Sequence, residues 1–451
     1  MPLQKNQVLT LRVERLSSDG SGVAHSPDGE TVFIPGAAPG DEARVRIVKD
    51  CKRYAFGILD EVLTPSPDRI PVDCAVAGPC GGCSLRHLDY AAELRAKQEN
   101  VADAFARIGG LDVPVLPIVG SPEVNRYRNK VQFPVGVDKS GKPCIGFYAG
   151  RTHRIVPCPD CRLQPGVLNE IGNALCAFFA EKGIQPYSEE TGRGLVRHIF
   201  LRRGAHSGQI MVCLVCTCAK LPCAEELCTR LKAQFAEITT ILLNVNAKNT
   251  NVILGTETHT LYGPGYIEDT LCGVPVQLGP LSFYQVNTLA AEQLYGIAAQ
   301  YAQLTPDDLL LDLYCGMGTI GLSMAAHCRE LIGVEIVPEA IESAKANAAR
   351  MGADVAAKSR FFCADAGQAA TRLAAEGLHP DIVMLDPPRK GCDEATLSAV
   401  VRMAPRRVVY VSCNPATAAR DAAWLEQNGY HAEKVQPVDL FPRTRHCECV
   451  L

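Results

Sequence analysis

A group of closely spaced cysteines is the first feature of this sequence that could carry chemistry. Cys74, Cys80 and Cys83 fall within ten residues, with two glycines between the last two, and Cys158 and Cys161 form a pair further along the chain. Thiolates at such spacing can surround one metal centre. Four thiolates suit either a [4Fe–4S] cluster or a zinc ion, and the spacing leaves both possibilities open.

A glycine-rich turn is the second such feature. The run Leu311-Asp-Leu-Tyr-Cys-Gly-Met-Gly-Thr-Ile-Gly321 is expected to pass from a strand through the turn into a helix. Glycines there let a ligand approach the backbone at the helix N-terminus. Glu335 ends the next expected strand, where a carboxylate accepts hydrogen bonds from the ribose of a dinucleotide or of S-adenosylmethionine. The pattern therefore indicates an adenosine-containing cofactor without saying which one.

Two further motifs directly follow expected strands. Asp386 begins Asp-Pro-Pro-Arg-Lys-Gly, and Cys413 lies in Ser412-Cys-Asn-Pro415. Because the carboxyl ends of parallel strands meet at one edge of a sheet, both residues are expected on the edge that carries Gly316. A cysteine there is a candidate nucleophile, with a buried core thiol as the alternative. The aspartate turn favours a methyltransferase acting on a base over a nicotinamide enzyme.

The elements that must position these residues fall into three segments, 1–62, 63–275 and 276–451. The first has short alternating runs between Gly/Pro turns, which is typical of a small β-barrel. The second mixes strands with helices over about 90–108 and 166–182. In the third, apolar strands alternate with helices over 288–303, 338–351 and 416–428, which predicts a parallel sheet covered on both faces. The predicted fold class is therefore α/β, with a mixed α+β central domain.

Basic residues in two of these segments are candidate nucleic-acid contacts. Arg126, Arg128 and Lys130 alternate along one run, and if that run is a strand they share one face. Such a face suits a phosphate backbone, although a merely solvated face is equally consistent. The basic and aromatic loop from Lys49 to Tyr54 could bind phosphates and stack a base. Three more arginines complete the candidate set: Arg197, Arg202 and Arg203.

Composition limits the class of protein. The chain has 451 residues, with 45 Lys and Arg against 49 Asp and Glu, so its net charge of −4 excludes a uniformly basic nucleic-acid coat. The N-terminus lacks the apolar core of a signal peptide, and no apolar run approaches the ~18 residues of a membrane span. The 21 cysteines are therefore expected in a reducing cytoplasm, as thiols, metal ligands or nucleophiles. No obligate protein partner is evident.

Together these motifs resemble the S-adenosylmethionine-dependent RNA (uracil-5-)-methyltransferases, and the resemblance covers essentially the whole chain. It is strongest to the 23S ribosomal RNA type, which carries an N-terminal TRAM domain, a [4Fe–4S] cluster and a C-terminal Rossmann-like methyltransferase domain. The resemblance implies that residues 1–62 form an OB-like, RNA-binding TRAM barrel. It implies that 63–275 holds the cluster and that 276–451 binds S-adenosylmethionine.

The resemblance also implies roles for individual residues. Cys413 would be the nucleophile and Glu448, in His446-Cys-Glu, the general base. The implied cluster ligands are Cys74, Cys80, Cys83 and Cys161, the last following His153-Arg-Ile-Val, with Cys158 as an additional thiol. The implied cofactor contacts are Gln285 in Phe-Tyr-Gln-Val-Asn, Tyr314, Thr319, Glu335, Asp365 and Asp386.

The implied reaction is methylation of C5 of a uridine in 23S rRNA through a covalent adduct between Cys413 and C6. Ribosomal RNA is favoured over transfer RNA because the barrel and the cluster accompany the ribosomal branch of the resemblance. A tRNA uridine methyltransferase is the alternative within the family. Alternatives of a different class are an iron–sulfur nicotinamide oxidoreductase and a non-enzymatic RNA-binding protein stabilised by zinc.

Overall fold

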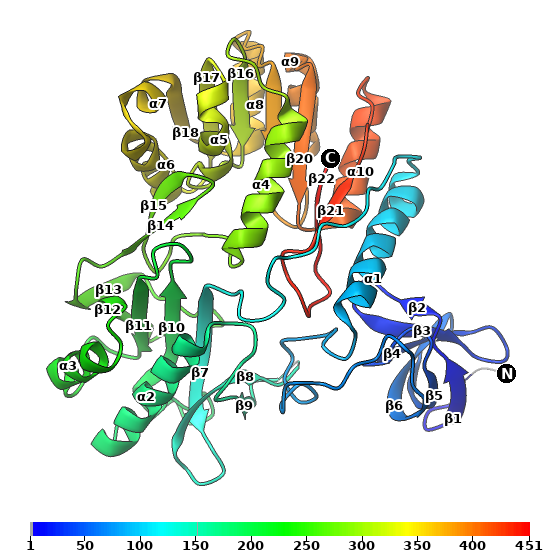
Figure 1. The fold of residues 1–451 in the computed structure, drawn as a ribbon, viewed down its shortest axis with the longest axis vertical. Coiled ribbons are helices and arrows are strands. Elements are labelled where there is room, and N and C mark those ends of the chain that lie inside the picture. The colour runs from blue at the N-terminus through cyan, green and yellow to red at the C-terminus, as the bar shows by residue number, and fades with distance from the viewer. Residues whose placement is uncertain (1–2, 151) are drawn as a thin grey trace. The chain divides into compact units, whose positions relative to one another are not determined.

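The computed structural model describes residues 3–150 and 152–451, and the chain forms two compact units (Figure 1). Unit 1 contains residues 1–124, 388–391 and 412–451, and unit 2 contains residues 125–387 and 392–411. None of the helices in the described ranges is both long enough and apolar enough to cross a membrane.

The N-terminal part of unit 1 is a curled six-stranded sheet (Figure 1). Its strands are β1 (Val8–Arg12), β2 (Arg15–Leu16), β3 (Ser21–His25), β4 (Thr31–Pro35), β5 (Glu42–Asp50) and β6 (Tyr54–Thr64), in the order β1-β5-β6-β4-β3-β2. Alternation places apolar side chains such as Val32, Ile34, Val45 and Ile47 inside, where all four are fully buried. The predicted small β module is confirmed.

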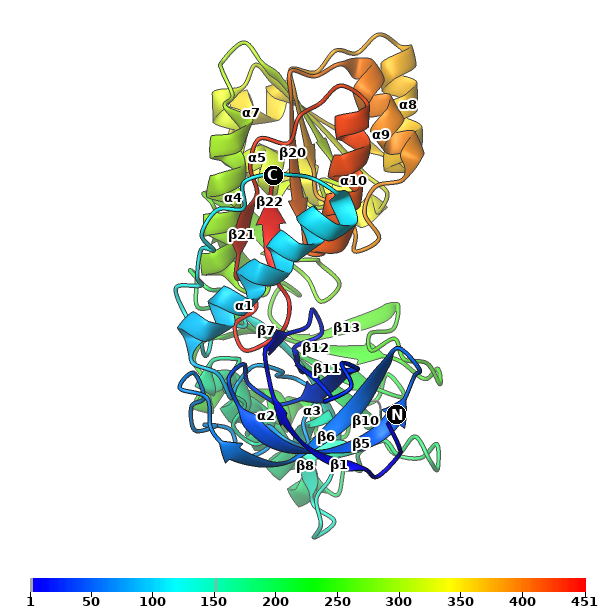
Figure 2. The same cartoon turned by 90° about the vertical axis from the view of Figure 1, so that its right-hand side faces the viewer.

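The rest of unit 1 combines segments from both ends of the chain. Helix α1 (Tyr90–Asp103) continues as the π-helix η1 (Ala104–Gly109), and α10 (Pro415–Gln427) packs against η1 (Figure 2). The close approach leaves no room for a side chain at Gly109, because a Cβ there would lie 3.0 Å from the Ala419 carbonyl oxygen. Two short antiparallel strands, β21 (Gln436–Val438) and β22 (Glu448–Val450), end the unit.

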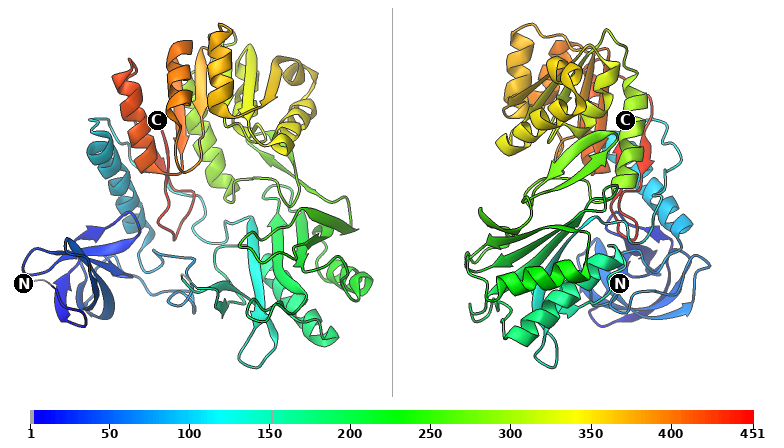
Figure 3. Two further views of the ribbon diagram at one scale, coloured as in Figure 1. Left: turned by 180° about the vertical axis from the view of Figure 1, so that it is seen from behind. Right: turned by 60° about the vertical axis from the view of Figure 1, so that its left-hand side comes forward.

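Unit 2 begins with a mixed seven-stranded sheet. Its strands are β7 (Lys130–Val137), β8 (Pro143–Tyr148), β9 (Ile155–Pro157), β10 (Val196–Arg203), β11 (Ile210–Cys216), β12 (Ile238–Val245) and β13 (Glu257–Tyr262), in the order β13-β12-β11-β10-β7-β8-β9. Helices α2 (Gly166–Lys182) and α3 (Ala224–Gln234) pack their apolar side chains against it (Figure 3). Cys213 and Cys216 are fully buried in β11, as expected of core thiols, whereas Cys218 is exposed.

The second half of unit 2 is a parallel sheet with helices on both faces (Figure 2), which confirms the α/β class. A hairpin of β14 (Ile267–Leu271) and β15 (Val274–Leu278) precedes it. The strands are β16 (Leu309–Leu313), β17 (Glu330–Glu335), β18 (Ser359–Cys363), β19 (Ile382–Leu385) and β20 (Arg407–Ser412), in the order β18-β17-β16-β19-β20. The helices are α4 (Thr288–Ala302), α5 (Thr319–Met324), the short 3-10 helix η2 (Ala325–His327), α6 (Pro338–Met351), α7 (Ala353–Lys358), α8 (Ala366–Ala375) and α9 (Glu394–Met403).

Candidate active site

Four of the six predicted cofactor residues lie at one edge of the parallel sheet in unit 2. Tyr314 follows β16, Glu335 ends β17, Asp365 follows β18 by one residue, and Asp386 follows β19. These strands pair in parallel, so their carboxyl ends meet at the same edge. Ligands of open parallel sheets bind at that edge. The structure therefore brings these four side chains to the place where a cofactor is expected.

The glycine turn shapes this edge. Tyr314 and Gly318 both have left-handed backbone conformations, with φ of 66° and 79°, and α5 begins immediately afterwards at Thr319. The Gly316 N–H donates to the Glu335 carboxylate at 3.2 Å, which ties the turn to the end of β17. Glu335 also accepts the N–H groups of Ile336 and Val337 at 2.9 and 3.0 Å. The turn is thus held open beside a fixed carboxylate.

Acidic side chains gather at the turn, and burial disfavours their charged forms. Asp312, the polar residue of β16, is 1% exposed; its Oδ2 accepts the Gly321 N–H at 3.0 Å and its Oδ1 has no hydrogen-bond partner. Burial, together with the nearby Asp386 and Glu335 carboxylates, raises the pKa of Asp312 to about 8. Burial raises the pKa of Asp386 to about 7. An orphaned buried carboxylate oxygen among other acids fits a cationic ligand, and S-adenosylmethionine is a sulfonium cation.

Gln285 lies on a loop that residues of the central sheet hold in place. Asn129 donates through Nδ2 to the Gln285 carbonyl oxygen at 2.8 Å and to the Thr288 hydroxyl at 2.9 Å. Arg202 donates to the carbonyl oxygens of Gly279 and Ser282 at 2.9 and 2.7 Å. Both donors are buried, so the loop from 279 to 288 has a fixed path.

A buried tyrosine connects two of the predicted cofactor residues. Tyr295 of α4 is 3% exposed and hydrogen-bonds the side chains of Thr319 and Gln285. Burial, with the nearby Asp386 carboxylate, raises the pKa of this tyrosine, so it stays a neutral hydrogen-bonding group. Tyr295 reads in the sequence as an ordinary apolar-face position of a helix, so no local signal marks it. Asp312, by contrast, is a polar residue inside an apolar strand, which is a visible signal.

Asp365, one of the four predicted cofactor residues at the sheet edge, also caps a helix. Its side chain accepts the Gln368 N–H at 3.1 Å and so caps α8. Side-chain capping of this kind stabilises a helix by about 1 kcal/mol. The cap fixes the carboxylate at the end of β18.

Cys413 lies in unit 1, in the turn between β20 and α10. Asn414 is the N-cap of α10 and accepts the Ala416 N–H, while its Nδ2 donates to the Arg389 carbonyl oxygen at 3.0 Å. The Ser412 hydroxyl accepts the Asn414 N–H at 3.1 Å. Cys413 is partly exposed. These contacts hold a reachable thiol at a helix N-terminus, where the helix dipole favours the thiolate.

Glu448, the predicted base, begins β22 and is 5% exposed. It pairs with Val438 across the β21–β22 hairpin. The next residue, Cys449, is fully buried, and the charges of Cys413, Cys447 and Glu448 all act on its thiol. The predicted nucleophile and the predicted base therefore both lie within electrostatic range of Cys449 in unit 1.

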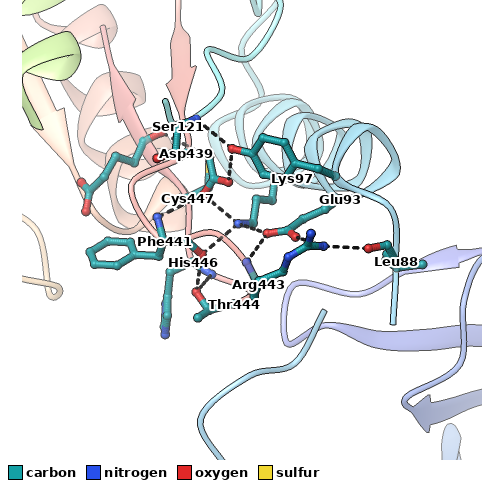
Figure 4. Close-up of polar contacts among 12 residues, drawn as sticks. Leu88, Glu93, Lys97, Ser121, Asp439, Phe441, Arg443, Thr444, His446 and Cys447 are labelled. Atoms are coloured by element: carbon teal, nitrogen blue, oxygen red, sulfur yellow. Dashed lines mark hydrogen bonds and ion pairs between the residues drawn. The ribbon is translucent and has the colours of Figure 1, made fainter. Parts of the chain in front are cut away.

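A buried ionic cluster anchors the segment that leads to Glu448 (Figure 4). Lys97 of α1, 2% exposed, donates to Glu93 at 2.7 Å, to Asp439 at 2.8 Å and to the Phe441 carbonyl oxygen at 3.1 Å. Burial by itself would lower the pKa of Lys97, but the two carboxylates outweigh it and raise the pKa. Tyr90 donates to the second Asp439 oxygen at 2.9 Å. We call Glu93, Lys97 and Asp439 the Lys97 cluster.

The same cluster reaches the cysteine-bearing loop through Arg443. The Arg443 N–H donates to Glu93 at 2.7 Å, and its carbonyl oxygen accepts the N–H groups of Ser84 and Leu85 at 3.0 and 3.1 Å. Just before these residues come Cys74, Cys80 and Cys83, all partly exposed and all in unit 1. Cys161 belongs to unit 2 and is partly exposed, whereas Cys158 is 3% exposed.

The predicted cluster ligands are divided between the two units. Across the described ranges, no group of three or more His, Cys, Asp or Glu side chains is close enough to hold a metal ion. The predicted cluster ligands thus have the right donor chemistry, four thiols, without a formed geometry. Spacing pointed to the group of cysteines, and the family resemblance chose these four.

The predicted basic strand face is wrong at its first two residues, because Arg126 and Arg128 both precede the strand. Strand β7 begins only at Lys130, and Arg126 has a φ of 61°, a left-handed conformation that no strand continues through. The Arg126 side chain donates to the Cys161 and Gln164 carbonyl oxygens and pairs with Asp160 at 2.7 Å. Arg126 therefore stabilises the loop around Cys161 rather than presenting charge to a phosphate backbone.

Two further arginines of the predicted RNA-binding set are also structural. Arg197 is 5% exposed, donates to the Asn246 and Lys248 carbonyl oxygens, and lies over the Tyr187 ring. Arg202 is 1% exposed and too deeply buried for direct solvent contact. Alternation in sequence shows which residues share a face only where a strand forms, and it does not show whether that face is open.

The basic and aromatic loop of the barrel forms the hairpin tip between β5 and β6. Tyr54 is 39% exposed and packs edge-on against Phe33, with ring centroids 5.6 Å apart. Lys52 has a φ of 68° and donates its N–H to Asp50. The loop presents cations beside an exposed ring, which suits contact with single-stranded nucleic acid.

Comparison with known proteins identifies relatives of the whole chain. The sequence profile of the tRNA (uracil-5-)-methyltransferase family matches residues 276–451, and that of the TRAM domain matches residues 2–59. A protein of Halalkalibacterium halodurans, named an uncharacterized RNA methyltransferase, is 43% identical over 450 residues, covering 100% of this chain and 97% of that protein. A Listeria monocytogenes protein of the same description is 42% identical, covering 99% and 98%.

One solved structure is similar along its entire length. It is the Pyrococcus abyssi tRNA (uracil-54, C5)-methyltransferase in complex with S-adenosyl-L-homocysteine, with a TM-score of 0.78 and 26% sequence identity. The match covers 98% of this chain and 99% of that one. The likeness therefore extends through the barrel, the central sheet and the parallel sheet.

Proposed function

The chain belongs to the S-adenosylmethionine-dependent RNA (uracil-5-)-methyltransferase family with a TRAM domain, and we propose that it methylates C5 of a uridine in 23S ribosomal RNA. The observation that carries the proposal is the edge of the parallel sheet, where Tyr314, Glu335 and Asp386 follow neighbouring strands around an open glycine turn. S-adenosylmethionine, when bound, supplies an electrophilic methyl group. Its adenosine and sulfonium suit the ribose-binding carboxylate and the acidic surroundings of this edge.

Cys413 is proposed to be the nucleophile. Uracil C5 reacts poorly with a sulfonium methyl group until C6 carries a covalent substituent. The Cys413 thiolate adds to C6, the C5–C6 double bond opens, and the electron pair delocalises over C5 and the C4 carbonyl. C5 would then form its bond to the methyl group while the bond between that methyl group and the sulfonium sulfur breaks, and S-adenosylhomocysteine would leave as a neutral thioether. Since a paired base is inaccessible inside a helix, the uridine must be flipped out or taken from a loop.

Glu448 is proposed to complete the reaction. After methylation C5 carries both a proton and the methyl group, and Glu448 accepts that proton. The electron pair re-forms the C5–C6 double bond and expels Cys413 as the thiolate. General-base assistance of this kind contributes roughly 10²–10⁴ in rate. Burial of Glu448 at the start of β22 supports the role, because a buried carboxylate is held in one place.

We place the remaining proposed cofactor contacts around the same edge of the parallel sheet. Glu335 is proposed to bind the ribose and Asp386 to lie near the base and the methyl donor. The other proposed contacts are Gln285, Tyr314, Thr319 and Asp365. Gln285 and Thr319 both hydrogen-bond the Tyr295 side chain. The segments 1–62, 63–275 and 276–451 are proposed to serve RNA binding, cluster binding and catalysis, in that order.

A [4Fe–4S] cluster on Cys74, Cys80, Cys83 and Cys161 is part of the proposal. The four thiols have the donor chemistry that such a cluster needs, and the burial of Cys158 favours Cys161 as the fourth ligand. The reaction above transfers no electron, so the cluster would support folding or RNA binding. Iron analysis of anaerobically purified protein tests it: about four irons per chain supports the cluster, and one zinc overturns it.

Transfer RNA is the second candidate substrate. The similar Pyrococcus abyssi structure is of a tRNA methyltransferase, and its match includes the barrel, so it favours tRNA. The resemblance of the cysteine motif to the ribosomal type favours ribosomal RNA. Incubation of unmodified 23S rRNA and tRNA transcripts with labelled S-adenosylmethionine, followed by site mapping, separates the two. Methylation of tRNA alone would overturn the ribosomal assignment.

Two variants test the chemistry. Glu448→Gln should form the adduct and methylate C5 but fail to release the RNA, so a covalent protein–RNA complex should persist on denaturing gels. Cys413→Ala should give neither complex nor product. Normal turnover by Glu448→Gln, or residual wild-type activity in Cys413→Ala, would refute the corresponding role. Retained S-adenosylmethionine binding in both is the control for folding.

A further inference from the structure

Two cations of the central sheet face each other directly. Lys130, the first residue of β7, is the cross-strand partner of Arg202 in β10. Partners in an antiparallel pair project from the same face of the sheet, and like charges in this position repel. Arg202 is 1% exposed, and Lys130 is only partly exposed. The pair is therefore a like-charge contact with little water to screen it.

A third cation adds to the repulsion, and no carboxylate relieves it. Arg128 lies close enough for its charge to act on Lys130. In the part of the chain that the structure describes, none of these three side chains forms an ion pair with Asp or Glu. The two Arg202 hydrogen bonds go to neutral carbonyl oxygens, and the Nε groups of Arg202 and Arg128 are buried without a partner. We call Arg128, Lys130 and Arg202 the Lys130 cluster.

Uncompensated buried charge is costly, so an arrangement of this kind needs a counter-charge. Burial, followed by the charges of Arg202 and Arg128, lowers the pKa of Lys130 to about 8. An anion that accepts several hydrogen bonds would offset this cost, because Lys130 and Arg128 are partly exposed and the Lys130 ammonium alone has three donors. The Lys130 cluster is therefore arranged like an anion-binding site, and its anion would have to come from another molecule.

The cluster lies directly behind the loop that carries Gln285. Arg202 holds the carbonyl oxygens of Gly279 and Ser282, and Asn129, next to Lys130, holds that of Gln285. An anion at the cluster would therefore lie beside a segment proposed to contact the cofactor. The carboxylate of S-adenosylmethionine is the other anion that could approach this loop, so cofactor binding has to be measured separately from RNA binding.

We propose that Lys130 and Arg128, with the buried Arg202 behind them, form a site for a backbone phosphate of the substrate RNA, beside the loop that carries Gln285. Lys130 and Arg128 would contact the phosphate oxygens, and Arg202 would add charge while fixing the 279–282 loop. Phosphates recur along an RNA chain, whereas the cofactor brings one carboxylate, so three cations match the RNA better. The inference rests on the proposed function and names the site that orients its substrate.

The test measures RNA binding separately from methyl transfer. The full-length wild type is compared with Lys130→Met, Arg128→Met and Lys130→Arg, and Lys139→Met is the matched control, because Lys139 is an exposed lysine at the tip of the same β7–β8 hairpin. The probe is a labelled unmodified 23S rRNA fragment or tRNA transcript, whichever the wild type binds more tightly. Kd is measured by fluorescence anisotropy over a range of salt concentrations, and S-adenosylmethionine binding by equilibrium dialysis.

Lys130→Met should weaken RNA binding roughly tenfold and reduce the slope of log Kd against log salt by about 0.7–0.9, the loss of one phosphate contact. Arg128→Met should act in the same direction, and Lys130→Arg should restore most of the affinity. Lys139→Met should stay within about twofold of wild type. S-adenosylmethionine affinity should be unchanged in all four variants.

The other outcomes overturn the site. Unchanged RNA binding in both Lys130→Met and Arg128→Met would refute it, and weaker S-adenosylmethionine binding with unchanged RNA binding would assign the anion to the cofactor instead. Equal losses of RNA affinity in Lys130→Met and Lys139→Met would show that any lysine on this hairpin contributes only through its charge. That result would also refute the phosphate site. If RNA binding depends on Lys130 and the wild type transfers no methyl group, the proposed function fails while the phosphate site stands.

Discussion

Lys97 in unit 1 and Lys130 in unit 2 are both withdrawn from water, but their surroundings are opposite. Lys97 lies between Glu93 and Asp439 and also donates to a carbonyl oxygen, so its positive charge is compensated within the chain. Lys130 faces Arg202 and Arg128 and has no acidic neighbour among the described residues. The pKa of Lys97 is raised because the carboxylates outweigh burial, and the pKa of Lys130 is lowered to about 8 by burial and like charge.

The contrast separates two uses of buried charge. A compensated cluster holds chain segments together, and here it joins α1 to the segment that leads to Glu448. An uncompensated cluster is a stability cost that only a ligand can offset. Three predictions test this contrast, in order of decreasing effect.

Lys97→Met should produce the largest loss of stability. It leaves the buried Asp439 without its cation and Glu93 with only the longer contact to Arg443, and breaking a buried ion pair in this way costs about 3–5 kcal/mol in the free energy of unfolding. Urea denaturation with circular dichroism measures the change. The double variant Lys97→Met/Asp439→Asn should recover part of the loss, because the amide oxygen can still accept from Tyr90. A loss below about 1 kcal/mol would contradict the anchoring role of the Lys97 cluster.

The affinity for RNA should decrease as the pH rises through about 8. Below that pH Lys130 is protonated and attracts phosphate, and above it a growing fraction is neutral. The charge-dependent part of the affinity, roughly tenfold, should therefore be lost on the alkaline side in the wild type. Lys130→Arg stays charged and should show a flatter profile. The same alkaline decrease in Lys130→Arg would show that another group is responsible.

Lys130→Met should leave stability unchanged or raise it by up to about 1 kcal/mol in the absence of RNA, because it removes a repulsive cross-strand pair. The pKa of Lys130 is lower in the folded than in the unfolded chain, so the unfolded chain binds more protons and wild-type stability rises with pH above about 8. The gain should therefore be present below pH ~8 and disappear at higher pH. Thermal melts at two pH values test this; a clear destabilisation would mean that Lys130 has a counter-charge within the chain.

Local patterns in the sequence were sufficient for much of the fold. Helix α2 spans Gly166–Lys182 and α6 spans Pro338–Met351, as predicted from periodicity and punctuation by proline and glycine. The strand-end positions of Tyr314, Glu335 and Asp386 followed from the same signals, because a parallel sheet brings successive carboxyl ends to one edge. The place of the motif around Cys413 could be predicted for the same reason, because it directly follows an apolar strand and precedes a helix with proline at its start.

Contacts between residues that lie far apart in the sequence could not be predicted. Lys97 and Asp439 lie 342 residues apart in sequence, and no spacing rule connects them. The position of Arg126 was predicted wrongly because its left-handed backbone, fixed by contacts with the loop around Cys161, ends the alternation before β7 begins. The sequence by itself determined the elements, the cofactor edge and the candidate chemistry, because these follow from local periodicity and short motifs. Only the tertiary structure decided which buried charges are compensated, because charge compensation depends on neighbours that folding brings together.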